Sequence, residues 1–136
     1  MHTKLKEILI VEDSESLLKT MTQGITDFNF KSFSCRVDGA VNGRDGYKKA
    51  LIQQYDLIIT DMKMPEKDGP EFIKDIRGIN SYKKTPIIFM SGFFQLTPSD
   101  SYESYAEDLI FLDKPFSMTK ICNILNILFS EKSHAA

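Results

Sequence analysis

The chain has 136 residues, of which 42% are hydrophobic and 26% are charged, and its formal net charge is −2. This length suits one domain with a hydrophobic core. The mixture of acids and bases argues against direct binding to nucleic acid, which favours a basic patch. No apolar run has the roughly 20 residues of a membrane helix, and residues 1–6 are not followed by the apolar segment and cleavage site of a signal peptide. Cys35 and Cys122 have no partner at metal-ligand spacing, so both are expected to be buried thiols in a reducing cytoplasm.

Short apolar runs alternate with helical patterns along the chain. Four runs are apolar on both faces, which is typical of interior strands in a parallel sheet covered by helices. They span residues 8–11, 57–59, 87–90 and 109–112. Residues 33–37 alternate between apolar and polar side chains, a pattern that favours an edge strand.

Helices are predicted between these strands, because apolar residues recur there at helical spacing. They cover residues 14–28, 44–54, 70–79, 99–106 and 117–130. Asp13 or Ser14 is expected to cap the first of them. Five strand–helix units in this order predict a doubly wound parallel sheet with helices on both faces. We expect a single domain with a core over about residues 6–130 and a tail at 131–136.

Polar side chains follow the predicted interior strands. They are Glu12 and Asp13, Asp61, Ser91 (which Gly92 follows), and Asp113 and Lys114. In the flavodoxin-like strand order 2-1-3-4-5, ligands bind outside the carboxyl ends of the strands, between the first and the third. Glu12, Asp13 and Asp61 are therefore expected to meet at one rim, beside Ser91 and Lys114.

Three carboxylates in one cleft repel each other. At roughly 4 Å and an effective dielectric constant near 20, each pair costs on the order of 4 kcal/mol. Mg²⁺ suits such a site, because it takes oxygen ligands and is usually held by one or two carboxylates together with a phosphate. Lys114 adds a second positive charge.

These motifs together resemble the signature of the response-regulator receiver domains of two-component signal transduction. The matching pieces are Glu12-Asp13, Asp61-Met62-Lys63-Met64-Pro65 with Gly69, Ser91-Gly92, and Lys114-Pro115-Phe116. Each piece alone is weak, but their order and spacing on successive strand ends are specific. The resemblance covers about residues 7–129.

The resemblance implies a phosphoryl-transfer site in which Asp61 is the nucleophile. Asp61 would take a phosphoryl group from a phosphohistidine of a sensor histidine kinase or phosphotransfer domain and lose it slowly to water. The implied metal is Mg²⁺ or Mn²⁺, bound by Glu12, Asp13, Asp61 and the backbone carbonyl of Lys63. Such a chain would be a signalling phosphoacceptor rather than an enzyme acting on other substrates.

The resemblance also assigns roles around the phosphoryl group. Lys114 and Ser91 would contact its oxygens, and the backbone amides of Met62 and Gly92 would add hydrogen bonds. Ser91 and Phe111 would form a switch in which Ser91 moves inward and the Phe111 ring rotates. The family resemblance also makes the Lys114–Pro115 peptide bond a candidate for the cis form.

The implied output surface consists of the helix over residues 99–106, the strand over 109–112 and the helix over 117–130. It would bind a downstream protein or a second copy of the chain, and no membrane. Phe93 and Phe94 are compatible either with the core or with an exposed patch for a partner.

Three other functions fit parts of the pattern. A receiver that is not phosphorylated would act only as an interaction module. A haloacid-dehalogenase-type phosphatase would carry a second Asp two residues after its nucleophile, where this chain has Lys63. A flavodoxin would need a phosphate-binding loop after the first strand, where Glu12 and Asp13 would repel the phosphate of the cofactor.

Overall fold

The computed structural model describes residues 4–62, 67–91 and 108–130. The strands are β1 (Lys4–Val11), β2 (Phe33–Ala40), β3 (Leu57–Asp61), β4 (Ile87–Ser91) and β5 (Leu109–Asp113). The helices are α1 (Glu15–Asp27), α2 (Gly43–Ile52), α3 (Gly69–Arg77) and α4 (Met118–Phe129), with a 3-10 turn over Asn80–Tyr82. Helix α4 is therefore the helix predicted over residues 117–130. The helix predicted over 99–106, the pair Phe93 and Phe94, and the tail at 131–136 lie outside the described residues.

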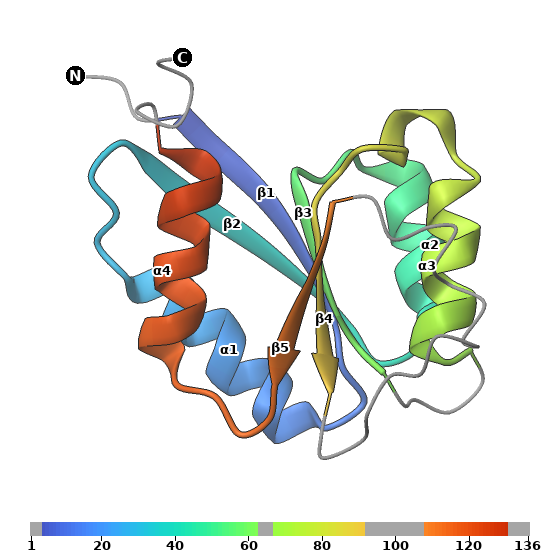
Figure 1. The fold of residues 1–136 in the computed structure, drawn as a ribbon, viewed down its shortest axis with the longest axis horizontal. Coiled ribbons are helices and arrows are strands. Elements are labelled where there is room, and N and C mark those ends of the chain that lie inside the picture. The colour runs from blue at the N-terminus through green and yellow to red at the C-terminus, as the bar shows by residue number, and fades with distance from the viewer. Residues whose placement is uncertain (1–3, 63–66, 92–107, 131–136) are drawn as a thin grey trace.

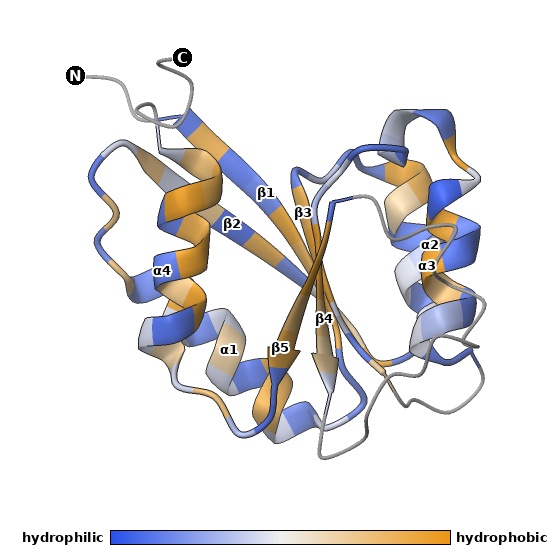
Figure 2. Ribbon diagram, viewed as in Figure 1, coloured by the Kyte–Doolittle hydropathy of each residue, from blue (hydrophilic) through white to orange (hydrophobic). Residues whose placement is uncertain are grey.

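The five strands form one parallel sheet in the order β2-β1-β3-β4-β5, as predicted. Helices α1 and α4 cover one face of the sheet, and α2 and α3 cover the other (Figure 1). Every residue of β3 and β4 is buried, and both strands are mostly apolar in Figure 2. This is the flavodoxin-like, doubly wound architecture.

Three strands differ from what their local sequence patterns indicated. The apolar run at 109–112 is typical of an interior strand, but β5 lies at the end of the sheet, as the strand order 2-1-3-4-5 requires, and is only partly buried. Apolar composition reports the hydrophobicity of a strand and not the number of its neighbours, so the sequence pattern was misleading there. Strand β1 also begins earlier than predicted, at Lys4, because its exposed first residues pair with the start of β2. Strand β2 correspondingly runs on to Ala40.

Side-chain caps determine where the helices begin. The Ser14 hydroxyl accepts the backbone N–H of Leu17 at the start of α1, so Ser14 rather than Asp13 is the cap. Asn42 caps α2, which begins at Gly43, one residue before its predicted start. At α3, Asp68 and Glu71 form a reciprocal capping box, which satisfies two backbone donors at once.

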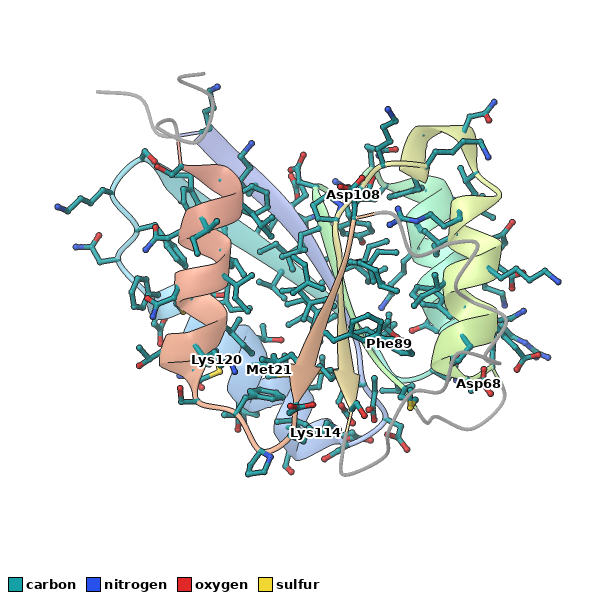
Figure 3. All side chains as sticks on the ribbon, in the orientation of Figure 1. Met21, Asp68, Phe89, Asp108, Lys114 and Lys120 are labelled. Atoms are coloured by element: carbon teal, nitrogen blue, oxygen red, sulfur yellow. The ribbon has the colours of Figure 1, made fainter. Side chains whose placement is uncertain are left out.

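The hydrophobic core is divided by the sheet into two clusters. One, which includes Phe89, lies toward α2 and α3, and the other, which includes Met21, lies toward α1 and α4 (Figure 3). Both side chains are fully buried. Buried cores of this kind hold the strand ends in fixed relative positions, which is the requirement for a site built across several strands. None of the described helices has the length and apolarity that a membrane crossing requires.

Candidate functional site

The carboxyl ends of the central strands meet at one edge of the sheet. Parallel registry places Asp61 of β3 opposite Met90 of β4, and Ser91 opposite Asp113 of β5. Lys114 follows directly, and Figure 3 shows it at this edge. The registry therefore brings together polar residues that are far apart in the sequence.

Three carboxylates gather there, as predicted. Glu12, Asp13 and Asp61 each offer an oxygen, and these oxygens lie within 4.8 Å of one another. Glu12 is 1% exposed and Asp61 is 8% exposed, whereas Asp13 faces solvent. Two of the three charges are thus held in a buried environment, where repulsion between them is weakly screened.

Local hydrogen bonds orient the two buried carboxylates. The backbone N–H of Ser14 donates to Glu12 Oε2 at 3.0 Å, and that of Met62 donates to Asp61 Oδ1 at 2.8 Å. Burial raises the pKa of Glu12 above its usual value, and the charge of Asp61 adds to this effect. The hydrogen bond from Ser14 and the charge of Lys114 oppose the rise without cancelling it.

Lys114 is the cation of the cluster. Its Nζ lies 3.1 Å from Asp61 Oδ1 and 3.5 Å from Glu12 Oε1. Its backbone N–H donates to the carbonyl of Ser91 at 2.6 Å, which ties the end of β5 to the end of β4. The Lys114–Pro115 peptide bond is cis, as the resemblance suggested. The sequence predicted that Lys114 would lie beside these carboxylates, and the fold supplies its individual contacts with Asp61 and Glu12.

Of the remaining predicted site residues, the structure describes Ser91 and Met62 but not Lys63 and Gly92. Ser91 is the last residue of β4 and is 4% exposed. The backbone N–H of Met62 also donates to the carbonyl of Met90 at 2.9 Å, so a phosphoryl contact would require it to exchange an acceptor. Lys63 and Gly92 lie outside the described residues, and their predicted roles stay predictions.

Phe111 occupies β5 with an exposed fraction of 47%. Its ring centroid lies 5.9 Å from that of Phe89, a buried residue of β4. The ring therefore sits at the surface beside the strand that ends in Ser91. This position is compatible with the predicted switch.

Gly69 contributes to the site in a way that sequence reasoning missed. A Cβ at this position would lie 2.5 Å from the backbone oxygen of Asp61 and 2.9 Å from the Cα of Met62. The Gly69 N–H also donates to the Met62 carbonyl at 2.9 Å. Only glycine permits this close approach. The sequence singled out Gly69 by motif alone, because the neighbour that requires it is supplied by the fold.

The donor set fits a small divalent cation. Carboxylate oxygens are hard ligands of the kind that Mg²⁺ and Mn²⁺ take, and all three oxygens are close enough together to share one ion. Lys114 already neutralises part of the charge, but within the described part of the chain its ammonium faces three carboxylates. A second positive charge would complete the compensation.

A family comparison shows which family the chain belongs to. Residues 8–126 match the model of the response regulator receiver domain. The chain belongs to that family. It is a receiver domain of two-component signal transduction, and the match spans every residue of the site described here.

Individual relatives agree with this assignment. The receiver domain is 35% identical over 102 residues to the response regulator ArlR of Staphylococcus aureus, covering 75% of this chain and 41% of that protein. The chain thus spans less than half the length of these curated relatives.

Solved structures give the same result. The chemotaxis response regulator CheY4 of Vibrio cholerae is 27% identical, with a TM-score of 0.75 over 92% of this chain and 99% of that one. The signal receiver domain of a signal transduction histidine kinase from Syntrophus aciditrophicus is 25% identical. Its TM-score is 0.76 over 96% of this chain and 95% of that one.

Proposed function

We propose that this receiver domain accepts a phosphoryl group on Asp61 from a phosphohistidine of a sensor histidine kinase or phosphotransfer domain. The observation that carries the proposal is the environment of Asp61. Its carboxylate sits at a strand end, 3.1 Å from the Lys114 ammonium and beside the carboxylates of Glu12 and Asp13. The family assignment supports the same reading.

In the proposed transfer, an Asp61 oxygen attacks the phosphorus and forms a P–O bond. The P–N bond to the donor imidazole breaks, and its electron pair returns to the ring nitrogen. The product is an acyl phosphate on Asp61. Attack by water later releases inorganic phosphate and restores the carboxylate.

Lys114 and Ser91 divide the charge of the transferring group. The Lys114 ammonium exchanges the Asp61 carboxylate for a phosphoryl oxygen, and the Ser91 hydroxyl donates to a second oxygen. The backbone amides of Met62 and Gly92 are proposed as further donors. Catalysis in this scheme consists of positioning and electrostatics, which suits a site that is mostly buried and set on rigid strand ends.

Glu12, Asp13, Asp61 and the carbonyl of Lys63 are the residues that would hold Mg²⁺ or Mn²⁺. When bound, the ion supplies positive charge that neutralises the carboxylates and the phosphoryl oxygens. The three carboxylates otherwise repel the incoming phosphoryl group, so we expect phosphorylation to depend on the metal. This dependence is a direct consequence of the charges around Asp61.

The proposed output is a change of surface. The Ser91 hydroxyl would move toward the phosphoryl group and the Phe111 ring would turn inward from its half-exposed position. The surface formed by the segment 99–106, β5 and α4 would then change its affinity for a downstream protein or a second copy. Phe111 has no hydroxyl, so the readout would rely on the shape of the ring and not on a hydrogen bond.

The test is phosphorylation with acetyl phosphate in the presence of Mg²⁺, followed by intact-mass measurement. We expect the mass to rise by that of one phosphoryl group, and we expect chelation of the metal to abolish the rise. Asp61→Asn should remove it entirely. A suitable matched control is Asp56→Asn, because Asp56 immediately precedes β3 at the end opposite Asp61 and its Oδ2 accepts the backbone N–H of Glu7.

If the mass of the wild-type chain did not change, the proposal would fail, and the alternative of a receiver that acts without phosphorylation would remain. If Asp61→Asn were still phosphorylated, the phosphoryl acceptor would be a residue other than Asp61. The family assignment argues against the phosphatase and flavodoxin alternatives. Turnover of a small phosphate ester would bring back the phosphatase.

A further inference from the structure

Strand β2 ends the sheet opposite to β5, and no described strand lies on its outer side (Figure 1). In a parallel pair, every second residue directs both of its backbone groups to the same neighbour. The N–H of Glu12 donates to the carbonyl of Ala40, so the even-numbered residues of β2 face β1. The odd-numbered residues Cys35, Val37 and Gly39 therefore direct their backbone groups outward. Such an edge is a template for another strand.

Hydrophilic and hydrophobic side chains alternate along β2, as Figure 2 shows. Arg36 and Asp38 lie on the side of α2, where they pair with each other at 2.8 Å. Asp38 also accepts a hydrogen bond from the Tyr55 hydroxyl at 2.6 Å, which belongs to the same face. Cys35 and Val37 pack against the cluster beneath α1 and α4.

Hollows flank the edge on both sides. One of about 320 Å³ is lined by residues of β2 and α2 that include Arg36, Asp38 and Ile52. The other, of about 660 Å³, lies between α1 and the end of β2. Gly39 lines both hollows, and Leu18 of α1 and Lys49 of α2 both reach it, so the more open part of the edge is centred on Val37. Ile52 is 87% exposed, which adds apolar area beside the edge.

We propose that this edge binds a second copy of the chain by antiparallel pairing of the two β2 strands, with Val37 opposite Val37 of the partner subunit. The two-fold axis would pass between these residues, which would exchange both backbone hydrogen bonds. The carbonyl of Gly39 already accepts from the Lys49 ammonium, so the new ladder would be centred on Val37.

Charge complementarity selects a second copy as the occupant. In this register each Arg36 lies opposite Asp38 of the partner subunit, and each Asp38 lies opposite Arg36 of the partner subunit. Opposite charges at cross-strand positions are favourable, and like charges are unfavourable. The small residues Cys35 and Gly39 also face each other across the pair. A two-fold contact requires such self-complementarity.

The same charges exclude the neighbouring symmetric registers. A slip of the symmetry centre to Arg36 would place the two guanidinium groups opposite each other. A slip to Asp38 would do the same with two carboxylates. The register centred on Val37 is therefore the one favoured by electrostatics, and it makes the inference specific enough to test.

The first test is a charge swap measured by sedimentation equilibrium. At concentrations up to about 1 mM, which would detect even a weak contact, we expect the wild-type chain to dimerise. Arg36→Glu and Asp38→Arg should each be monomeric alone, because each places like charges opposite each other. Their equimolar mixture should dimerise, because every cross-strand pair in the mixed dimer is again attractive. Lys74→Glu on α3 controls for the change in net charge of Arg36→Glu, and Asp75→Arg on the same helix controls for that of Asp38→Arg.

The second test removes one backbone donor. Val37→Pro deletes an outward N–H and leaves the hydrogen bonds between β1 and β2 in place, since Pro is tolerated at such positions of an edge strand. We expect a monomer that retains the wild-type circular dichroism spectrum. If Val37→Pro does not fold, the charge swap decides the question alone.

A wild-type chain that stays monomeric would overturn the inference. So would a dimer that tolerates both single charge reversals, because it would then form through another surface. Monomeric single variants whose mixture stays monomeric would rule out this register. None of these measurements depends on phosphorylation of Asp61, so the inference and the proposed function can fail separately.

Discussion

Replacing Asp61 with Asn is expected to make the metal-free protein more stable, although it removes the proposed phosphoryl acceptor. The substitution keeps the shape of the side chain and the oxygen that accepts the Met62 N–H. It removes one negative charge from a buried cluster that contains Glu12. It also removes a partner of Lys114, which retains Glu12.

The size of the effect follows from three opposing contributions. Repulsion between Asp61 and Glu12 at 4.8 Å or less is worth at least about 3.5 kcal/mol at an effective dielectric constant near 20. Burial of the Asp61 charge costs about 3 kcal/mol more. Attraction between Asp61 and Lys114 at 3.1 Å stabilises the charged form by about 5 kcal/mol at the same effective dielectric constant. The balance favours the amide by about 1 to 2 kcal/mol, which corresponds to a rise in Tm of roughly 3 to 7 °C for a domain of this size.

The assay is urea and thermal unfolding of both proteins with a chelator present, followed by titration with Mg²⁺. The wild-type Tm should rise with Mg²⁺, by the equivalent of about 2.7 kcal/mol at a concentration 100 times Kd. The rise should be smaller in Asp61→Asn, which has one carboxylate fewer. An Asp61→Asn protein that is clearly less stable than wild type without metal would refute the reasoning. It would mean that the ion pair with Lys114 outweighs the repulsion and the burial.

Three further predictions concern groups outside the site. Tyr82→Phe should lower the free energy of unfolding by about 1 to 3 kcal/mol in urea titrations, because the buried hydroxyl accepts the Tyr55 N–H and donates to a backbone carbonyl; an unchanged midpoint would contradict this. Burial opposes ionisation of Asp38, but hydrogen bonds from Tyr55 and Arg36 outweigh it and lower the pKa of Asp38. Because the folded pKa lies below the unfolded value, this stabilisation is present above about pH 4 and is lost as the pH falls through the folded pKa. Tyr55→Phe should therefore be less stable than wild type at neutral pH, and unfolding at pH 3 should show a smaller difference; equal differences at the two pH values would count against the Asp38 contact. Burial raises the pKa of the Cys35 thiol to about 12, so alkylation at pH 8 should be slow in the folded protein and rapid in urea, and fast labelling of the native chain would show that the thiol is not protected.

Much of the fold follows from local sequence patterns. Runs that are apolar on both faces predicted the buried strands β3 and β4, and Ser14 was among the predicted helix caps. These features depend on nearest neighbours in the chain, so one sequence is enough to reveal them. The local pattern of β5 was misleading, because the apolar content of a strand does not report how many neighbours it has, and its edge position followed only from the expected strand order.

For the site too, some features follow from the sequence alone and others from the fold. The sequence by itself determined which groups follow the strands: the carboxylates of Glu12, Asp13 and Asp61, and the amine of Lys114. Residue types and their place after apolar runs are local properties. A familiar order of motifs then indicated their common edge.

Only the tertiary structure decided how these groups act on each other. Lys114 contacts Glu12 across 102 residues of sequence, and Gly69 approaches the backbone of Asp61 so closely that a Cβ would not fit. The outward backbone groups of β2 likewise depend on which strand lies beside it. Charge repulsion, steric exclusion and hydrogen bonding act through space, and the distances they depend on exist only once the sheet has formed.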